Sequence, residues 1–102
     1  MNVVREEVES LVDKELKAAT ERFGLHHSYH EKYAVTLEEL QECEEEVKWM
    51  RTFLDDAFEY IRKNNRNAAY DNFYTVYNHA VSCAVEAIQV AAMCKKESEN
   101  DA

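Results

Sequence analysis

Apolar residues recur along the chain at steps of three and four positions, with polar or charged residues between them. This spacing is the period of an α-helix that buries one stripe of its surface. It predicts helices over residues 4–23, from residue 28 to about residue 63, and from residue 67 or 68 to about residue 96. The stripes of the two longer helices contain Tyr33, Leu37, Leu40, Val47, Met50, Leu54, Ala57, Phe58 and Ile61, and Phe73, Val76, Tyr77, Ala80, Ala84, Ala87, Ile88 and Ala91. Pro is absent and Gly occurs once, so we expect an all-α fold.

One glycine and two capping sequences predict where the first helix ends and the second begins. Gly24 can adopt a positive φ at no steric cost, which suits a residue that terminates a helix. Capping boxes then occur at Ser28 with Glu31 and at Thr36 with Glu39, so the second helix starts at one of these two places. We favour Ser28.

A polar run, Asn64–Asn67, separates the two longest helices and is typical of a turn. A connection this short predicts that the two helices form a hairpin within an antiparallel bundle of three. The 102 residues form a single domain, 1–102, whose core is small enough that oligomerisation would complete it. Its polar and acidic end, residues 97–102, is expected to fray.

Charge and cysteine content exclude several classes of protein. A net charge of −9 and a pI near 4.9 argue against binding to nucleic acid or to an anionic membrane surface. The longest nearly apolar run, residues 81–94, is shorter than the roughly 20 residues of a membrane span. The first residues are polar and acidic, unlike an export signal. Three cysteines without a paired spacing indicate a reducing compartment, and we expect a cytoplasmic protein.

The candidate chemistry lies in acidic residues on the two longest helices. A hairpin centred on residues 64–67 pairs positions whose numbers sum to about 131. This register places Glu42 and Glu46 opposite Gln89 and Glu86. Facing carboxylates are costly unless protons or cations neutralise them, and Mg²⁺ prefers oxygen ligands. The pattern therefore predicts a metal site, although a slip of one turn would bring Glu39 or Glu45 to Glu86 instead.

Other interpretations of the same residues stay open. The acidic run 38–46 is also typical of a solvated helix face. Glu86 lies in an otherwise apolar segment, where it would alternatively pair with a lysine or arginine across an oligomer interface. His26, His27 and His30, with Cys43 further along, suggest zinc, but a structural zinc site needs four ligands and no second close pair follows.

Two segments of the chain resemble the MazG-like all-α nucleoside triphosphate pyrophosphohydrolases, most closely the phage-type members with a single domain. They are residues 30–42 (HEKYAVTLEELQE) and residues 86–93 (EAIQVAAM). The family pattern is a Glu-Glu-x-x-Glu helix followed by a Glu-x-x-Asp helix. Glu38, Glu39 and Glu42 match its first part, and Glu86 matches the start of its second part.

The resemblance implies Mg²⁺-dependent, or Mn²⁺-dependent, hydrolysis of a nucleoside triphosphate to the monophosphate and pyrophosphate. It assigns Glu39, Glu42 and Glu86 to the metal and Glu38 to orienting the attacking water. It also implies a homo-oligomer, a dimer or a tetramer.

The chain departs from the family pattern in two respects. Gln89 replaces the Asp of the second motif, and the two motifs are further apart than usual. Gln89 can still offer its amide oxygen to the metal, and Glu46 is an additional candidate ligand that would replace the missing charge. The alternative function is a helical interaction module that keeps this scaffold without its chemistry.

Overall fold

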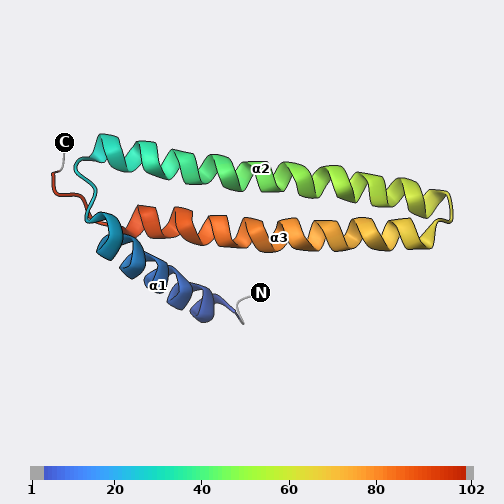
Figure 1. Ribbon diagram of the computed structural model, residues 1–102, viewed down its shortest axis with the longest axis horizontal. Helices are drawn as coiled ribbons and strands as arrows, with labels where there is room; N and C mark the ends of the chain where they lie inside the picture. The colour runs from blue at the N-terminus through green and yellow to red at the C-terminus, as the bar shows by residue number, and fades with distance from the viewer. Residues whose placement is uncertain (1–3, 101–102) are drawn as a thin grey trace. The chain divides into compact units, whose positions relative to one another are not determined.

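The computed structural model describes residues 4–100 and contains three α-helices (Figure 1). They are α1 (Arg5–Phe23), α2 (Tyr29–Arg62) and α3 (Arg66–Lys95). The predicted all-α fold is confirmed, as is the antiparallel hairpin of the two longest helices. The described chain divides into two compact units. The terminal unit extends up to Gln41 and resumes at Glu86, and the hairpin unit is Glu42–Val85.

The end of α1 follows the sequence signal. Gly24 has a φ of 75°, a conformation that residues with a Cβ rarely adopt, and its backbone N–H donates to the Thr20 carbonyl at 2.8 Å. The helix therefore ends at Phe23, as predicted.

The start of α2 uses the first of the two capping boxes. The Ser28 hydroxyl accepts a hydrogen bond from the backbone N–H of Glu31 at 3.2 Å. The Glu31 carboxylate accepts one from the His27 N–H at 3.3 Å. These contacts satisfy donors that a helix N-terminus otherwise leaves unpaired. Thr36 lies inside α2, and its buried hydroxyl has no hydrogen-bond partner among the described residues.

The turn between α2 and α3 is shorter than the predicted run Asn64–Asn67. It consists of Lys63–Asn65, with Asn64 at a φ of 55°. The Asn65 side chain accepts a hydrogen bond from the Ala68 N–H at 3.2 Å and caps α3. The predicted register is also wrong. Facing residues in the hairpin unit have numbers that sum to 125 and 126, not to about 131.

Residues 97–100, part of the segment predicted to fray, form hydrogen bonds with the connector between α1 and α2. The backbone N–H of His26 donates to the Glu97 carbonyl at 3.0 Å, and the Glu99 N–H donates to the His26 carbonyl at 2.7 Å. The Asn100 amide adds a hydrogen bond to the His27 carbonyl at 2.9 Å. Backbone groups of the connector therefore bind this polar segment, although it has no apolar residue to pack. Residues 101–102 lie outside the described residues.

Few apolar side chains of the described chain are fully covered. Ala57 and Ala69 are buried in the hairpin unit, and Ala92 and Met93 in the terminal unit. Many residues of the predicted stripes are instead exposed, including Tyr33, Leu40, Val47, Leu54, Phe58, Ile61, Phe73 and Tyr77. None of the helices in residues 4–100 is long and apolar enough to cross a membrane.

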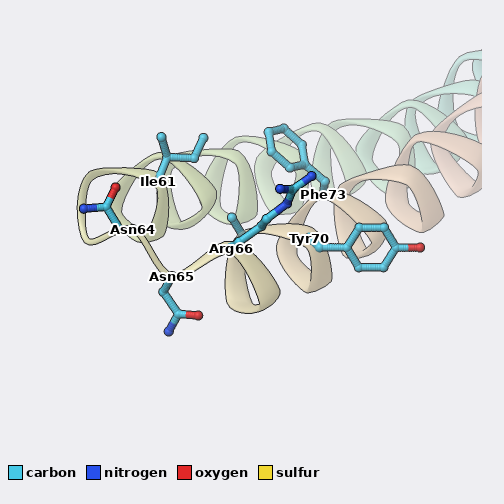
Figure 2. Close-up of a pocket in the computed structure, with 7 residues that line it drawn as sticks. Ile61, Asn64, Asn65, Arg66, Tyr70 and Phe73 are labelled. Atoms are coloured by element: carbon cyan, nitrogen blue, oxygen red, sulfur yellow. The ribbon is translucent and has the colours of Figure 1, made fainter.

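The turn end of the hairpin unit carries an apolar hollow of about 530 Å³ (Figure 2). Ile61 of α2 and Ala69, Tyr70 and Phe73 of α3 line it together with turn residues. Phe73 is 47% exposed and Tyr70 is 67% exposed. The hairpin unit therefore presents an apolar surface that its own two helices do not cover.

Candidate functional site

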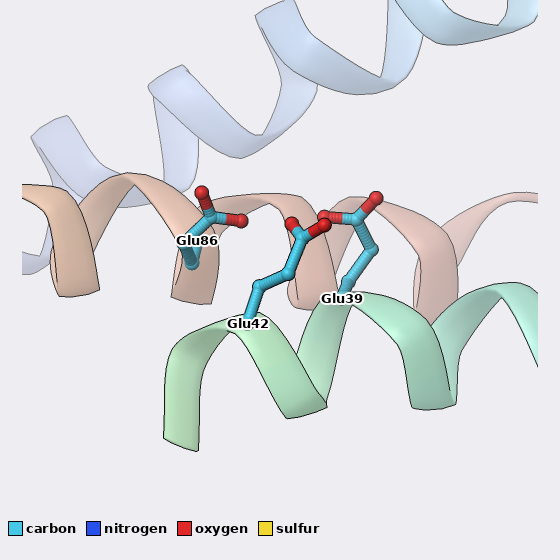
Figure 3. A group of neighbouring side chains, drawn as sticks. All are labelled: Glu39, Glu42 and Glu86. Carbon is cyan, nitrogen blue, oxygen red and sulfur yellow. The ribbon is translucent and has the colours of Figure 1, made fainter. Parts of the chain in front are cut away.

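Glu39 of α2 and Glu86 of α3 lie close together in the terminal unit (Figure 3). Each has a carboxylate oxygen within 4.8 Å of an oxygen of the other, and both residues are half-buried. Two carboxylates this close repel each other, and partial burial weakens the screening by water. The pair therefore favours a neighbour that supplies positive charge or hydrogen-bond donors.

Gln89 supplies such donors. Its side-chain amide lies next to both carboxylates, and the orientation that satisfies them turns the amide nitrogen toward them. The nitrogen then donates to Glu39 Oε2 at 3.0 Å and to Glu86 Oε2 at 2.9 Å. An amide nitrogen carries two N–H groups, so one residue serves both acceptors.

The other predicted acidic residues occupy three different settings. Glu42, drawn in Figure 3, follows Glu39 by one turn on α2 and is exposed. Glu38 is exposed. Glu46 lies in the hairpin unit, where its carboxylate accepts a hydrogen bond from His79 Nδ1 at 2.6 Å.

The terminal unit also contains a cavity of about 560 Å³ beside Glu39 and Gln89. Its wall is completed by Glu15, Ala19, Phe23, His26, His27, Glu31, Val35, Met93 and Lys96. The volume lies within the range of ordinary small-molecule pockets. The space is thus large enough for a ligand next to the acidic pair.

Lys96 is the one cationic lysine or arginine in this wall, and it is only 5% exposed. A buried lysine normally has an anionic or hydrogen-bonding partner. None of the ion pairs found within residues 4–100 includes Lys96, whereas its neighbour Lys95 pairs with Asp13 at 2.5 Å. This difference was not predictable from the sequence, because both lysines follow the last apolar stripe residue of α3.

A second polar group that the sequence did not predict surrounds His79 in the hairpin unit. Its ring stacks on Phe53, with centroids 5.7 Å apart and planes at 9°. The Trp49 ring also stacks on the His79 ring, with centroids 6.2 Å apart. Aromatic rings therefore flank the hydrogen bond between His79 and Glu46. Together these side chains form a structural contact between α2 and α3.

Two histidines of the zinc interpretation, His26 and His27, make different contacts in the terminal unit. His26 is 1% exposed, and its Nε2 lies 3.1 Å from the Met93 carbonyl oxygen. His27 lies 3.4 Å from the Glu99 carboxylate. These contacts hold the connector, and no zinc ligand set gathers around them among residues 4–100.

The donor set at Glu39 and Glu86 fits a hard divalent cation. Carboxylate oxygens are the ligands that Mg²⁺ prefers, and two oxygens bound to one Mg²⁺ lie at most about 4.2 Å apart. A separation within 4.8 Å needs only small side-chain rotations to reach that value. The Gln89 amide would have to turn its oxygen toward the cation, which breaks its two hydrogen bonds to the carboxylates.

No family model, curated protein or solved structure matches the chain. The suggested relation to the MazG-like enzymes therefore depends on the two acidic motifs alone.

Proposed function

We propose that Glu39, Glu42 and Glu86 bind Mg²⁺ or Mn²⁺, and that the protein hydrolyses a nucleoside triphosphate to the monophosphate and pyrophosphate. The close approach of the Glu39 and Glu86 carboxylates within the terminal unit carries the proposal. Its second support is the match of Glu38, Glu39, Glu42 and Glu86 to the MazG-like motifs. Membership of that family is part of the proposal.

The bound cation would offset the charge of the triphosphate and orient it for in-line attack. Glu38 is exposed and precedes Glu39 in the chain. In the role that the resemblance implies, it would orient the attacking water and accept its proton. The water oxygen bonds to the α-phosphorus, the bond from this phosphorus to the bridging oxygen breaks, and pyrophosphate leaves. The reaction needs positioning and charge, not a nucleophilic side chain.

The cavity beside Glu39 offers a place for the substrate. Lys96 supports an anionic ligand there, because a phosphate would pair with its positive charge. Phe23, 68% exposed in the same wall, offers an aromatic face to a nucleobase.

The decisive experiment measures pyrophosphate release from ribo- and deoxyribonucleoside triphosphates with Mg²⁺ or Mn²⁺. Glu86→Gln keeps the shape of the side chain and removes its charge, so we expect release to fall by about 100-fold or more. Glu45→Gln is the matched control, because Glu45 is an exposed glutamate of the same acidic run outside the metal-binding group. The control should keep the parent rate.

Failure of the parent chain to release pyrophosphate from any triphosphate would refute the hydrolase. Equal rates in Glu86→Gln and the parent would instead assign the release to a contaminating enzyme. Mn²⁺ titration by isothermal calorimetry on the same proteins measures cation binding separately, and it should detect binding that Glu86→Gln weakens and Glu45→Gln preserves.

The hydrogen bonds of Gln89 favour the second candidate function, a helical interaction module without catalysis. They satisfy Glu39 and Glu86 in the absence of a cation. A module of this kind predicts a melting temperature that Mg²⁺ and Mn²⁺ leave unchanged, whereas a cation that binds the folded chain raises it. Thermal unfolding with and without each ion distinguishes the two functions.

We further propose that the chain works as a cytoplasmic homo-oligomer, a dimer or a tetramer. The exposed apolar residues of the hairpin unit support this assembly, since two helices alone leave their outer apolar faces in water. The cytoplasmic location is proposed from the sequence alone, because its three cysteines are an odd number without a paired spacing.

A further inference from the structure

Cys43 of α2 and Cys83 of α3 face each other across the hairpin unit. Their Sγ atoms are 3.6 Å apart, and both residues are half-buried. Each Sγ also lies close to the backbone carbonyl oxygen of the other cysteine, at 3.9 Å and 4.0 Å. The arrangement is reciprocal, so both thiols project into the same small space between the helices.

We propose that Cys43 and Cys83 are a redox-sensitive pair that forms a reversible disulfide between α2 and α3. A disulfide requires an S–S distance of about 2.05 Å. The sulfurs are therefore about 1.5 Å too far apart, a gap that small χ1 rotations and helix shifts can close. The oxidation joins two thiols that already lie next to each other, and no unfolding is needed.

A low-molecular-weight disulfide such as oxidised glutathione is the oxidant. One cysteine, as its thiolate, attacks a sulfur of that disulfide, forms a mixed disulfide and releases one glutathione thiol. The second cysteine then attacks the protein sulfur and releases the other glutathione. The protein loses two electrons and two protons, which reduce one glutathione disulfide to two thiols. Reduced glutathione reverses both steps.

The surroundings of the pair explain why the disulfide would matter to the hairpin. The next contact toward the turn is that of Glu46 with His79, one helical turn from each cysteine. A covalent bond at Cys43 and Cys83 would hold α2 and α3 together at this level even when the noncovalent contacts open. It would close a loop that includes the turn Lys63–Asn65, and so restrict the unfolded chain.

The test incubates the native protein with mixtures of oxidised and reduced glutathione, blocks remaining thiols and maps disulfides by mass spectrometry without reduction. We expect the bond between Cys43 and Cys83 to predominate within single chains. Cys94 is exposed and serves as an internal competitor. The same incubation in urea should give mixed pairings, because unfolding removes the proximity. Predominance of mixed glutathione adducts, or of disulfides to Cys94, in the native protein would overturn the proposal.

Thermal unfolding supplies a second readout. The oxidised chain should melt higher than the reduced chain by about 10 °C or more, since a disulfide that fits the native structure stabilises it. Cys83→Ser is the matched control, because it keeps a small polar side chain and cannot form this bond. Its melting temperature should not respond to oxidised glutathione. An oxidised parent that melts no higher than the reduced parent would show that the bond does not fit the native hairpin.

Discussion

Gln89 determines how the Glu39 and Glu86 carboxylates are compensated. Its amide nitrogen donates to both of them, with distances of 3.0 Å and 2.9 Å. Rotation of the amide by about 180° would present its oxygen in the same place and make it a neutral metal ligand. One residue thus distinguishes a cation-free pair from a cation-bound one, and it does so without a change of helix position.

This double role predicts the effect of Gln89→Asp. The substitution removes the two donated hydrogen bonds and adds a third negative charge, so without divalent ions we expect a loss of about 1–3 kcal/mol in the free energy of unfolding. The added carboxylate is a stronger ligand, so Mg²⁺ should stabilise the variant more than the parent. Urea denaturation with EDTA and with Mg²⁺ measures both effects.

The matched control for this substitution is Gln89→Ala, which removes the same hydrogen bonds without adding charge. It should lose stability in EDTA and gain no additional response to Mg²⁺. If Gln89→Asp is as stable as the parent in EDTA, the amide does not compensate the carboxylates.

The sequence predicted the residue types of the candidate site better than their partners. Glu86 drew attention as a charge in an apolar segment, and the structure places it opposite Glu39, the alternative that a slip of one turn allowed. Glu46 was predicted to meet Glu86 but contacts His79. The environment of Lys96 was not predictable, because residues 97–100 dock mainly on backbone groups of the connector, which leave no pattern in the sequence.

At the scale of the helices, local signals determine the ends and tertiary contacts determine the register. Gly24 and Ser28 act on their own neighbours, and the observed helix ends agree with them. The register across the hairpin depends on the exact length of the turn, and a shift of two or three residues there changes every facing pair. This is why the predicted sum of about 131 was wrong although the predicted turn region overlaps Lys63–Asn65.

The choice between the two capping boxes gives a prediction for α2. Ser28→Ala removes the hydroxyl that accepts from the Glu31 N–H, so it should cost about 1 kcal/mol of unfolding free energy. Thr36→Val replaces a buried hydroxyl without a partner by a methyl group of similar size, and it should be neutral or stabilising. Urea unfolding followed by circular dichroism compares the two variants. An equal loss in both would contradict the assignment of the cap to Ser28.

At the scale of the whole molecule, the small number of buried apolar residues needs an explanation. Long helices obtain most of their stability from packing of an apolar face. In the hairpin unit Ala57 and Ala69 are buried, while Phe58, Tyr70 and Phe73 are about half or more exposed. A second copy of the chain would cover such a surface with an equivalent one, as symmetric assemblies do.

Assembly of this kind predicts that Phe73→Glu dissociates the protein. A charge in the centre of an apolar interface is costly to bury, so the variant should sediment as a monomer where the parent sediments as a dimer or tetramer. Ser82→Glu adds the same charge to an exposed residue on the opposite face of α3. This variant should form an assembly of the same mass as the parent. Sedimentation equilibrium over a range of concentrations measures all three proteins. A parent chain that stays monomeric throughout would mean that the exposed apolar surface of the hairpin unit belongs to some other contact.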